Sequence, residues 1–347
     1  MASDLEQRLD AIYEIGEGPG ANRPGYSDGE DEAHRLVAGW MGEAGLEVEV
    51  DGDGNLVGRL PGLEPELPEV WSGSHLDSVP QGGRFDGPLG VLGALEAVER
   101  LGRRRRRTLA VVAFREEERG CVGSHGRVAR AGLPGAWVEL HHEQGPRLAL
   151  EGAPLAVVTA IVGYKRAERV IEGRAGHAGT TPMDARDDAL VAAAEEVLRI
   201  RDVARGIEGA VATVGRLEVE PGGVNVIPGR VTLTIDARAP DDERLARLLD
   251  ALAIDPAGAV PPTPLGGPPA DALRAAIEGR GIPVVELASG AGHDAGVLAR
   301  AGVPSAMLFV RALNGGVSHS PDELSSPEDV ALAVDVLTDA LDRLASG

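Results

Sequence analysis

Residues 73–90 contain the side chains whose types and spacing most directly suggest chemistry. The stretch reads Gly-Ser-His-Leu-Asp-Ser-Val-Pro-Gln-Gly-Gly-Arg-Phe-Asp-Gly-Pro-Leu-Gly. His75 and Asp77 are two residues apart, so on a strand their side chains lie on the same face. Asp86 follows in a glycine-rich loop just before Pro88, a residue suited to a first helical turn. An imidazole and two carboxylates at a strand's carboxyl end are typical of half a metal site, although a polar turn with an incidental histidine has the same composition.

Three further polar segments follow strand-like runs: residues 116–118, 137–145 and 317–321. The first is Glu-Glu-Glu, in which a metal bound by one carboxylate would relieve repulsion and leave a neighbour free to act as general base toward water. Each segment read alone has a structural or solvent-exposed interpretation. However, five of the eight histidines fall at or just beyond predicted strands: His75, His141, His142, His293 and His319. This clustering favours a metal site.

The residue types also constrain which metal centre is possible. Two divalent ions about 3.5–4 Å apart need one bridging carboxylate and further ligands on each side. Imidazoles and carboxylates suit zinc, cobalt or manganese, and a single cysteine, Cys121, argues against a structural zinc finger. Neighbouring residues on a strand face opposite ways, so only one of His141 and His142 should bind metal, and we predict His141.

The elements that must position these side chains alternate between strand and helix patterns up to about residue 156. Strands are predicted to end at His75 and to span 109–114, with a helix from Pro88 to about Leu101 between them. This alternation predicts an α/β fold with a mostly parallel sheet and helices on both faces. Sites in such sheets lie at the carboxyl ends of the strands.

The pattern changes near residue 157. The predicted elements are a strand, a helix, two strands and a helix, at 157–172, 184–205, 210–219, 231–238 and 241–252. This order resembles most of a ferredoxin-like α+β unit, and a Pro- and Gly-rich segment closes it. We therefore predict a catalytic domain in two parts, 1–156 and 270–347, with a smaller lid or dimerisation domain, 157–269, inserted.

Composition excludes several classes of protein. The net charge of −21 argues against nucleic acid as a partner, since phosphate binding needs clustered cations. No run of about 18 apolar residues suggests a membrane span. The acidic N-terminus lacks the pattern of a signal peptide, and the single cysteine allows no intrachain disulfide. We expect a cytoplasmic protein.

Several strings then resemble one known family nearly end to end. They include Glu-Gln-Gly-Pro at 143–146, His-Ala-Gly-Thr-Thr-Pro-Met at 177–183, Ser-Gly-Ala-Gly-His-Asp-Ala at 289–295 and Ser-His-Ser-Pro at 318–321. The chain thus resembles the hydantoinase/carbamoylase family of the di-zinc aminoacylase and exopeptidase superfamily. That family includes N-carbamoyl-L-amino acid hydrolases, β-ureidopropionases and allantoate amidohydrolases.

The resemblance implies two divalent metal ions per subunit, zinc first, with manganese or cobalt as alternatives. Asp86 would bridge the ions, His75 and His141 would complete one, and Glu118 and His319 the other. Glu117 would be the general base, and Asp77 would orient His75. The residues implied to hold the substrate's carboxylate or the oxyanion are His177, Asn225 and Arg238, and Gln144 is implied to contact the substrate beside the metals. The inserted domain would also form a homodimer interface.

Three departures from the family pattern concern the pocket and the inserted domain. The segment after Glu118 is shorter than usual, His142 occupies a normally apolar position, and the segment between Arg238 and Ser289 is shortened. The last departure leaves open whether the final strand of the inserted domain is lost. Asn225 lies beside two glycines and Pro228, so a turn role competes with substrate contact.

The leading hypothesis is a metal-dependent hydrolase of linear C–N amide or ureido bonds in small carboxylates, such as N-carbamoyl-L-amino acids or allantoate. An alternative is an N-acyl-amino acid or dipeptide hydrolase with the same machinery. A more remote one is an inactive member that binds a small acid.

Overall fold

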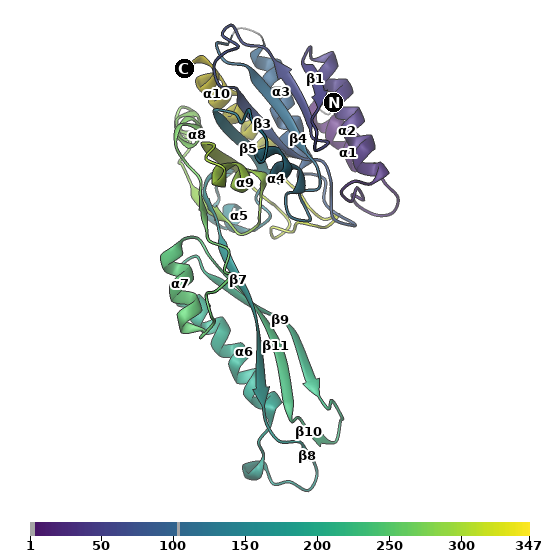
Figure 1. Cartoon of the computed structure of the whole chain (residues 1–347), viewed down its shortest axis with the longest axis vertical. Helices are drawn as coiled ribbons and strands as arrows, with labels where there is room; N and C mark the ends of the chain where they lie inside the picture. The colour runs from purple at the N-terminus through teal and green to yellow at the C-terminus, as the bar shows by residue number, and fades with distance from the viewer. Residues whose placement is uncertain (1–3, 103–104) are drawn as a thin grey trace. The chain divides into compact units, whose positions relative to one another are not determined.

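The structure is a computed structural model that describes residues 4–102 and 105–347. Residue contacts divide the chain into two compact units (Figure 1). Unit 1 comprises Met1–Thr159 and Pro264–Gly347, of which residues 1–3 and 103–104 lie outside the described part, and unit 2 comprises Ala160–Thr263. The boundaries of unit 2 lie within the predicted insertion, 157–269. No helix of the described residues is long and apolar enough to cross a membrane.

Unit 1 is built on a nine-stranded sheet in the order β1-β2-β4-β3-β5-β14-β6-β12, with β13 also paired to β6. The strands are β1 (Glu47–Val50), β2 (Leu56–Leu60), β3 (Val70–His75), β4 (Leu109–Phe114), β5 (Ala136–His142), β6 (Leu155–Ile161), β12 (Thr263–Pro264), β13 (Glu286–Ser289) and β14 (Ser305–Val310). The four central strands, β4, β3, β5 and β14, are parallel. β2 and β6 join them antiparallel. The predicted α/β class with a large, mostly parallel central sheet is confirmed, and its antiparallel flanks refine it.

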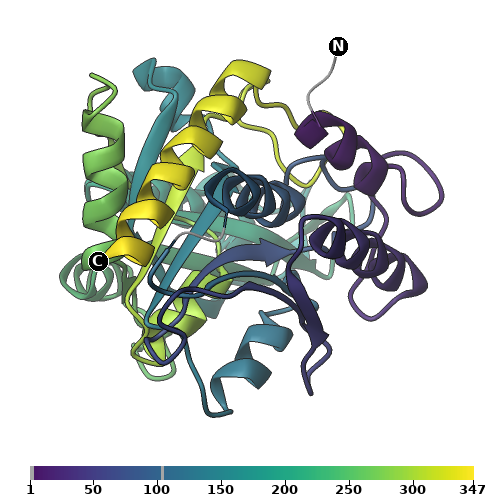
Figure 2. The ribbon, with the colours of Figure 1, turned by 90° about the horizontal axis from the view of Figure 1, so that it is seen from above.

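Helices cover both faces of this sheet because its central strands are apolar on both sides. Every residue of β3, β4, β5 and β14 is buried, as expected for parallel strands between helical layers. In Figure 2, α3 (Pro88–Leu101) and α10 (Pro327–Ser346) lie on one side, and α4 (Val122–Val128) on the other. α1 (Asp4–Tyr13), α2 (Asp28–Glu43) and α8 (Pro268–Glu278) contribute to the core with α3 and α10. α9 (Asp294–Arg300) packs with α4, and α5 (Arg147–Glu151) follows β5.

Unit 2 contains a three-stranded antiparallel sheet in the order β7-β11-β9. Its strands are β7 (Gly163–Glu172), β9 (Val211–Glu220) and β11 (Arg230–Ala239). Alternate residues of β11 are buried, and they pack with α6 (Ala189–Arg205) and α7 (Asp242–Ala251) in a separate core. The other face of the sheet carries the partly exposed residues of β11. A short pair, β8 (Gly176–His177) and β10 (Val226–Ile227), lies apart from this sheet.

Three predicted elements differ from the structure. The predicted strand 157–172 is two strands, β6 and β7, which belong to different sheets. The helix predicted from residue 184 begins at Ala189, because the Asp188 side chain accepts hydrogen bonds from the N–H groups of Leu190 and Val191 and caps it there. A 3₁₀ turn, Met183–Ala185, precedes it. The strand predicted at 284–287 lies at Glu286–Ser289.

Candidate metal centre

The parallel strands of unit 1 bring the predicted ligands together at their carboxyl ends. His75 is the last residue of β3, and His141 is the second-last residue of the adjacent β5. Glu117 and Glu118 follow β4, the other neighbour of β3. Asp86 lies just before α3, whose first residue is Pro88, as predicted. This is the edge at which α/β sheets place their sites.

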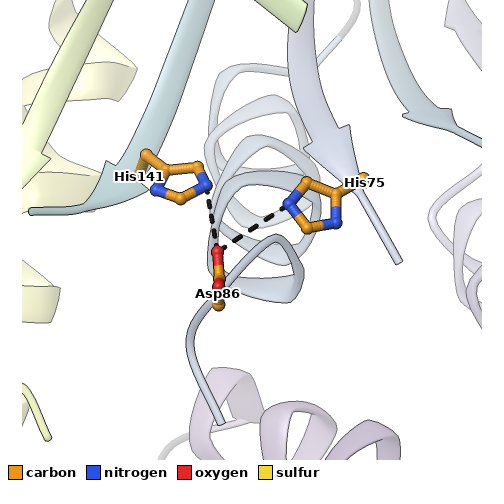
Figure 3. Close-up of side chains that lie close together, drawn as sticks. All are labelled: His75, Asp86 and His141. Carbon is orange, nitrogen blue, oxygen red and sulfur yellow. Dashed lines mark ion pairs between the residues drawn. The ribbon is translucent and has the colours of Figure 1, made fainter. Parts of the chain in front are cut away.

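Asp86, His75 and His141 form the first group that could hold a metal ion (Figure 3). The Asp86 Oδ1 atom lies 3.4 Å from His141 Nε2 and 3.8 Å from His75 Nε2. All three side chains are buried. Their ligand atoms point toward a common space between the strands and the start of α3.

Asp86 also belongs to a second group, with Glu118 and His319. Its Oδ2 atom lies 3.2 Å from His319 Nε2, which is 3.5 Å from Glu118 Oε2. The structure thus assembles all five predicted ligands into two triads that share one carboxylate. A shared carboxylate is the arrangement that a bridge between two cations requires.

The donor atoms present fit divalent metal ions. His141 Nε2 and Glu118 Oε1 are buried and have no hydrogen-bond partner among the described residues. Buried polar atoms are normally paired, so these two lack a partner that a cation would provide. Imidazole nitrogens and carboxylate oxygens are the donors expected for zinc, manganese or cobalt.

Asp77 contacts both the first triad, through His75, and the backbone of the Glu117–Glu118 pair. Its Oδ1 atom lies 3.2 Å from His75 Nδ1, the ring nitrogen that faces away from Asp86. Its two carboxylate oxygens also accept hydrogen bonds from the backbone N–H groups of Glu117 and Glu118, at 3.0 and 3.2 Å. One carboxylate therefore orients a candidate ligand and the turn that carries the candidate base.

Glu117 is buried beside the first triad, with Oε2 3.9 Å from His75 Nε2. Burial raises the pKa of Glu117 well above its ordinary value, and the negative charges of Asp294 and Glu118 add to that effect. A carboxylate with a raised pKa holds a proton more readily than an ordinary glutamate, which helps it to accept a proton and later return it. This is the property required of the predicted general base.

The charges of the cluster also shift the pKa values of its ligands. Burial opposes charge on His75, but the carboxylates of Glu117 and Asp77 outweigh it and raise the pKa of His75 well above its usual value. The hydrogen bond to Asp86 raises the pKa of His319 to about 9. Burial and the neighbouring Asp86 raise the pKa of Glu118. Without metal, a proton on His319 therefore offsets part of the negative charge of the site.

Gln144 lies next to the second triad. Its Nε2 atom is 3.1 Å from Asp86 Oδ2 and 3.3 Å from Ser318 Oγ. A carboxylate oxygen can only accept, so the amide nitrogen is the atom that faces Asp86. The Oε1 atom of Gln144 is buried and has no partner among the described residues. The side chain therefore offers an unused acceptor beside the candidate metal centre.

The other predicted substrate-binding residues lie in unit 2. β8 and β10 pair His177 with Val226, and the Ala178 N–H donates to the Asn225 carbonyl, so His177 and Asn225 are brought close together. Arg238 lies on β11, where its guanidinium forms a two-point ion pair with Asp236.

His142 faces away from the triads, as strand alternation predicts for the neighbour of His141. Its ring stacks on Phe85 with centroids 6.0 Å apart, and its Nδ1 atom lies 3.8 Å from Glu323 Oε2. Burial lowers the pKa of His142 to about 4, which keeps the ring neutral.

Sequence reasoning missed two buried carboxylates near the site. Glu139 accepts hydrogen bonds from the Ser74 hydroxyl, the Trp137 indole and the Ala295 N–H. It also lies near His141 and His293 in a third group of possible ligand atoms, but these hydrogen bonds already occupy its oxygens. Glu323 was equally unforeseen. It lies four residues after His319, and no periodic pattern marks its role.

Comparisons with known proteins assign this fold and its shared-carboxylate cluster to a family of hydrolases. The model of peptidase family M20/M25/M40 matches residues 71–343. An N-carbamoyl-L-amino acid amidohydrolase of Geobacillus stearothermophilus is 37% identical, covering 99% of this chain and 98% of that protein. An allantoate amidohydrolase of Bacillus subtilis is 32% identical, covering 94% of this chain and 93% of that protein.

Solved structures give the same result. A hydantoinase/carbamoylase family amidase from Burkholderia multivorans superposes with a TM-score of 0.87 at 32% identity, covering 99% of this chain and 97% of that one. The chain belongs to the M20/M25/M40 family and, within it, to the hydantoinase/carbamoylase amidases. It is therefore a hydrolase, and the resemblance seen in the sequence is confirmed.

Proposed function

We propose that this protein hydrolyses the ureido or carbamoyl C–N bond of small carboxylates, namely N-carbamoyl-L-amino acids or ureido acids such as allantoate. The observation that carries the proposal is the sharing of Asp86 by two ligand triads, with Glu117 buried beside them. The activities named for the relatives, N-carbamoyl-L-amino acid and allantoate amidohydrolase, support this choice of bond.

The proposed cofactor is a pair of divalent ions, zinc first and manganese or cobalt as alternatives. His75, Asp86 and His141 would hold one ion, and Asp86, Glu118 and His319 the other. When bound, the ions would lower the pKa of water and polarise the carbonyl group under attack. Glu117 would take the proton from the attacking water and return it to the leaving nitrogen. Asp77 would keep His75 and the Glu117 turn in place.

The proposed substrate contacts come from residues that can recognise an acid and a ureido group. Arg238 would release Asp236 and bind the substrate's carboxylate in its place, through a two-point contact. His177 would donate to the developing oxyanion, and Asn225, its neighbour in unit 2, would add a polar contact. Gln144 would accept an N–H of the ureido group through its unpaired Oε1 atom.

We further propose that residues 157–269 form a lid and the interface of a homodimer. In support, the face of the β7-β11-β9 sheet opposite α6 and α7 carries the exposed apolar residues Val170 and Val211. Sedimentation analysis would report a monomer at micromolar concentration if this interface did not exist.

The single cysteine, Cys121, supports the expectation of a cytoplasmic protein.

The decisive experiment combines metal analysis with a substrate panel. The protein, loaded separately with zinc, manganese and cobalt, is assayed on carbamoyl-amino acids, allantoate, N-acetyl-amino acids and dipeptides. We expect turnover of the first two classes, and loss of about 10²–10⁴-fold in Glu117→Gln with metal retained, the range typical of a removed general base.

The other outcomes distinguish the alternatives. Preference for the acetyl over the carbamoyl derivative of one amino acid would replace the proposal by N-acyl-amino acid hydrolysis. A protein that binds none of the three metals would be an inactive binding member.

A further inference from the structure

Glu323 is a buried carboxylate that neither triad uses. It is 5% exposed. Its Oε1 atom accepts hydrogen bonds from the backbone N–H groups of Phe85 and Asp86, at 2.7 and 3.0 Å. Its Oε2 atom accepts a hydrogen bond from the Ser318 hydroxyl at 2.8 Å. The same side chain therefore contacts the residue that carries the shared carboxylate and the residue that precedes His319.

These contacts join two loops that are remote in sequence. Asp86 and Glu323 are 237 positions apart. The space that Glu323 occupies exists because residue 83 is glycine: a Cβ atom there would lie 2.3 Å from Glu323 Oε1. The geometry of the Asp86 loop thus depends on a side chain from the far end of the chain.

A further connection runs from Glu323 to Gln144. The Ser318 hydroxyl donates its proton to Glu323, so its oxygen is left to accept, and Gln144 Nε2 lies 3.3 Å from it. Ser318 and Asp86 together fix the amide nitrogen of Gln144. The unpaired Oε1 atom of Gln144 is thereby held on the other side of the amide.

We propose that Glu323 is a positioning residue that ties the Asp86 loop to the His319 loop and so sets the separation of the two ligand triads. It acts by accepting hydrogen bonds and not by binding metal, because its oxygens already serve three donors. The inference rests on the proposed function, since a change in the separation of the triads affects activity only if both triads hold metal. Groups that orient metal ligands typically contribute 10–100-fold in metal affinity or activity.

Two conservative substitutions test the length and the charge of the Glu323 side chain separately. Glu323→Gln removes the charge but keeps the length: its carbonyl oxygen still accepts from both backbone N–H groups, and its amide donates to Ser318 Oγ. Glu323→Asp keeps the charge but is one methylene shorter, so it cannot span both loops. The matched control is Glu143→Asp, because Glu143 is also a buried glutamate that accepts hydrogen bonds from backbone N–H groups, including those of Arg147 and Leu148. Among the described residues it forms no hydrogen bond with Asp86, Ser318 or His319.

Zinc affinity is measured for each full-length variant by competition with a chromophoric chelator, with kcat and thermal stability alongside. We expect Glu323→Asp to bind zinc about 10–100-fold more weakly, and Glu323→Gln to bind as the unsubstituted protein does. Glu143→Asp should lose stability without losing zinc affinity.

The results have distinct meanings. Unchanged affinity in Glu323→Asp, or equal loss in Glu323→Gln and Glu323→Asp, would overturn the positioning role. Equal loss in Glu143→Asp would do the same, because the effect would then follow stability alone. Failure of the unsubstituted protein to bind zinc, manganese or cobalt would instead overturn the proposed function.

Discussion

Asp86 is the residue on which the site depends, because its two oxygens face different ligand atoms. Oδ1 faces His75 and His141, and Oδ2 faces His319. The sequence motif around Asp86 pointed to a metal site, and the family resemblance implied the bridging role. The distances show that one carboxylate can reach both groups. Whether it bridges two ions is the proposal that metal analysis tests.

Metal binding should be strongly pH-dependent at this site. In the metal-free protein the hydrogen bond to Asp86 raises the pKa of His319 to about 9, so the ring carries a proton at neutral pH. That proton must leave before the nitrogen can bind metal, so affinity should rise with pH and level off above about 9. Release of this one proton should raise the metal affinity about tenfold per pH unit.

Calorimetric titration with zinc at pH 6, 7 and 8, in buffers of different ionisation enthalpy, measures both the affinity and the protons released. The raised pKa of His75 should add to the release. An affinity that does not change with pH, with no proton released, would contradict the expected charge state of the metal-free cluster.

At the scale of elements, the site is made by a strand, a tight loop and a helix that begins immediately after it. Gly87 precedes Pro88 with a φ of +83°, in a region that favours glycine. A Cβ atom at residue 87 would also lie 2.5 Å from the imidazole of His75. Lack of a side chain there lets the helix start directly beside a ligand.

Gly87→Ala should therefore lower both the stability of the protein and its affinity for zinc. The control is Gly102→Ala at the other end of α3, where φ is +60° and, apart from the chain neighbours, no atom of the described residues lies within 4 Å of the added Cβ. Each substitution should cost about 1–3 kcal/mol of stability from the backbone conformation. Only Gly87→Ala should also weaken zinc binding, because it displaces His75. Denaturant unfolding and chelator competition on both variants measure the two effects, and equal zinc affinity in them would refute the argument.

Other elements show why the sequence predicts some features better than others. β4 was predicted at its observed bounds because an apolar run between polar ends is a local signal. The run 157–172 was predicted as one strand because local sequence does not say which sheet a strand joins. β6 pairs with β14 in unit 1, whereas β7 pairs with β11 in unit 2, and these partners are distant in sequence.

At the scale of the whole molecule, the two units have separate hydrophobic cores. Among the described residues, the main apolar cluster of unit 1 includes no residue between 160 and 263, and that of unit 2 includes none outside this range. The points where unit 2 leaves and rejoins unit 1 are close, because the Leu265 N–H donates to the Thr159 carbonyl at 2.9 Å. We therefore predict that unit 1 folds without unit 2.

Excision tests this division. Replacing residues 160–263 by a short Gly-Ser linker should leave a folded protein that binds zinc, because all five candidate ligands lie in unit 1. Hydrolysis should fall by at least about 100-fold, since His177 and Arg238 are removed and an oxyanion donor alone typically contributes that much. Circular dichroism, zinc competition and turnover are the three measurements. Undiminished turnover would show that unit 2 provides no substrate contact.

By itself, the sequence determined the fold class, the five candidate ligands, the candidate base and the family. These depend on signals that are local, either apolar periodicity or short strings such as His-Ala-Gly-Thr-Thr-Pro-Met. Only the tertiary structure decided the distances at which Asp86 meets the ligands of both triads, that Asp77 also holds the Glu117 turn, and that Glu323 links two loops 237 positions apart. Such contacts arise because strands distant in the sequence end at one edge of a sheet, and local sequence contains no measure of the resulting distances.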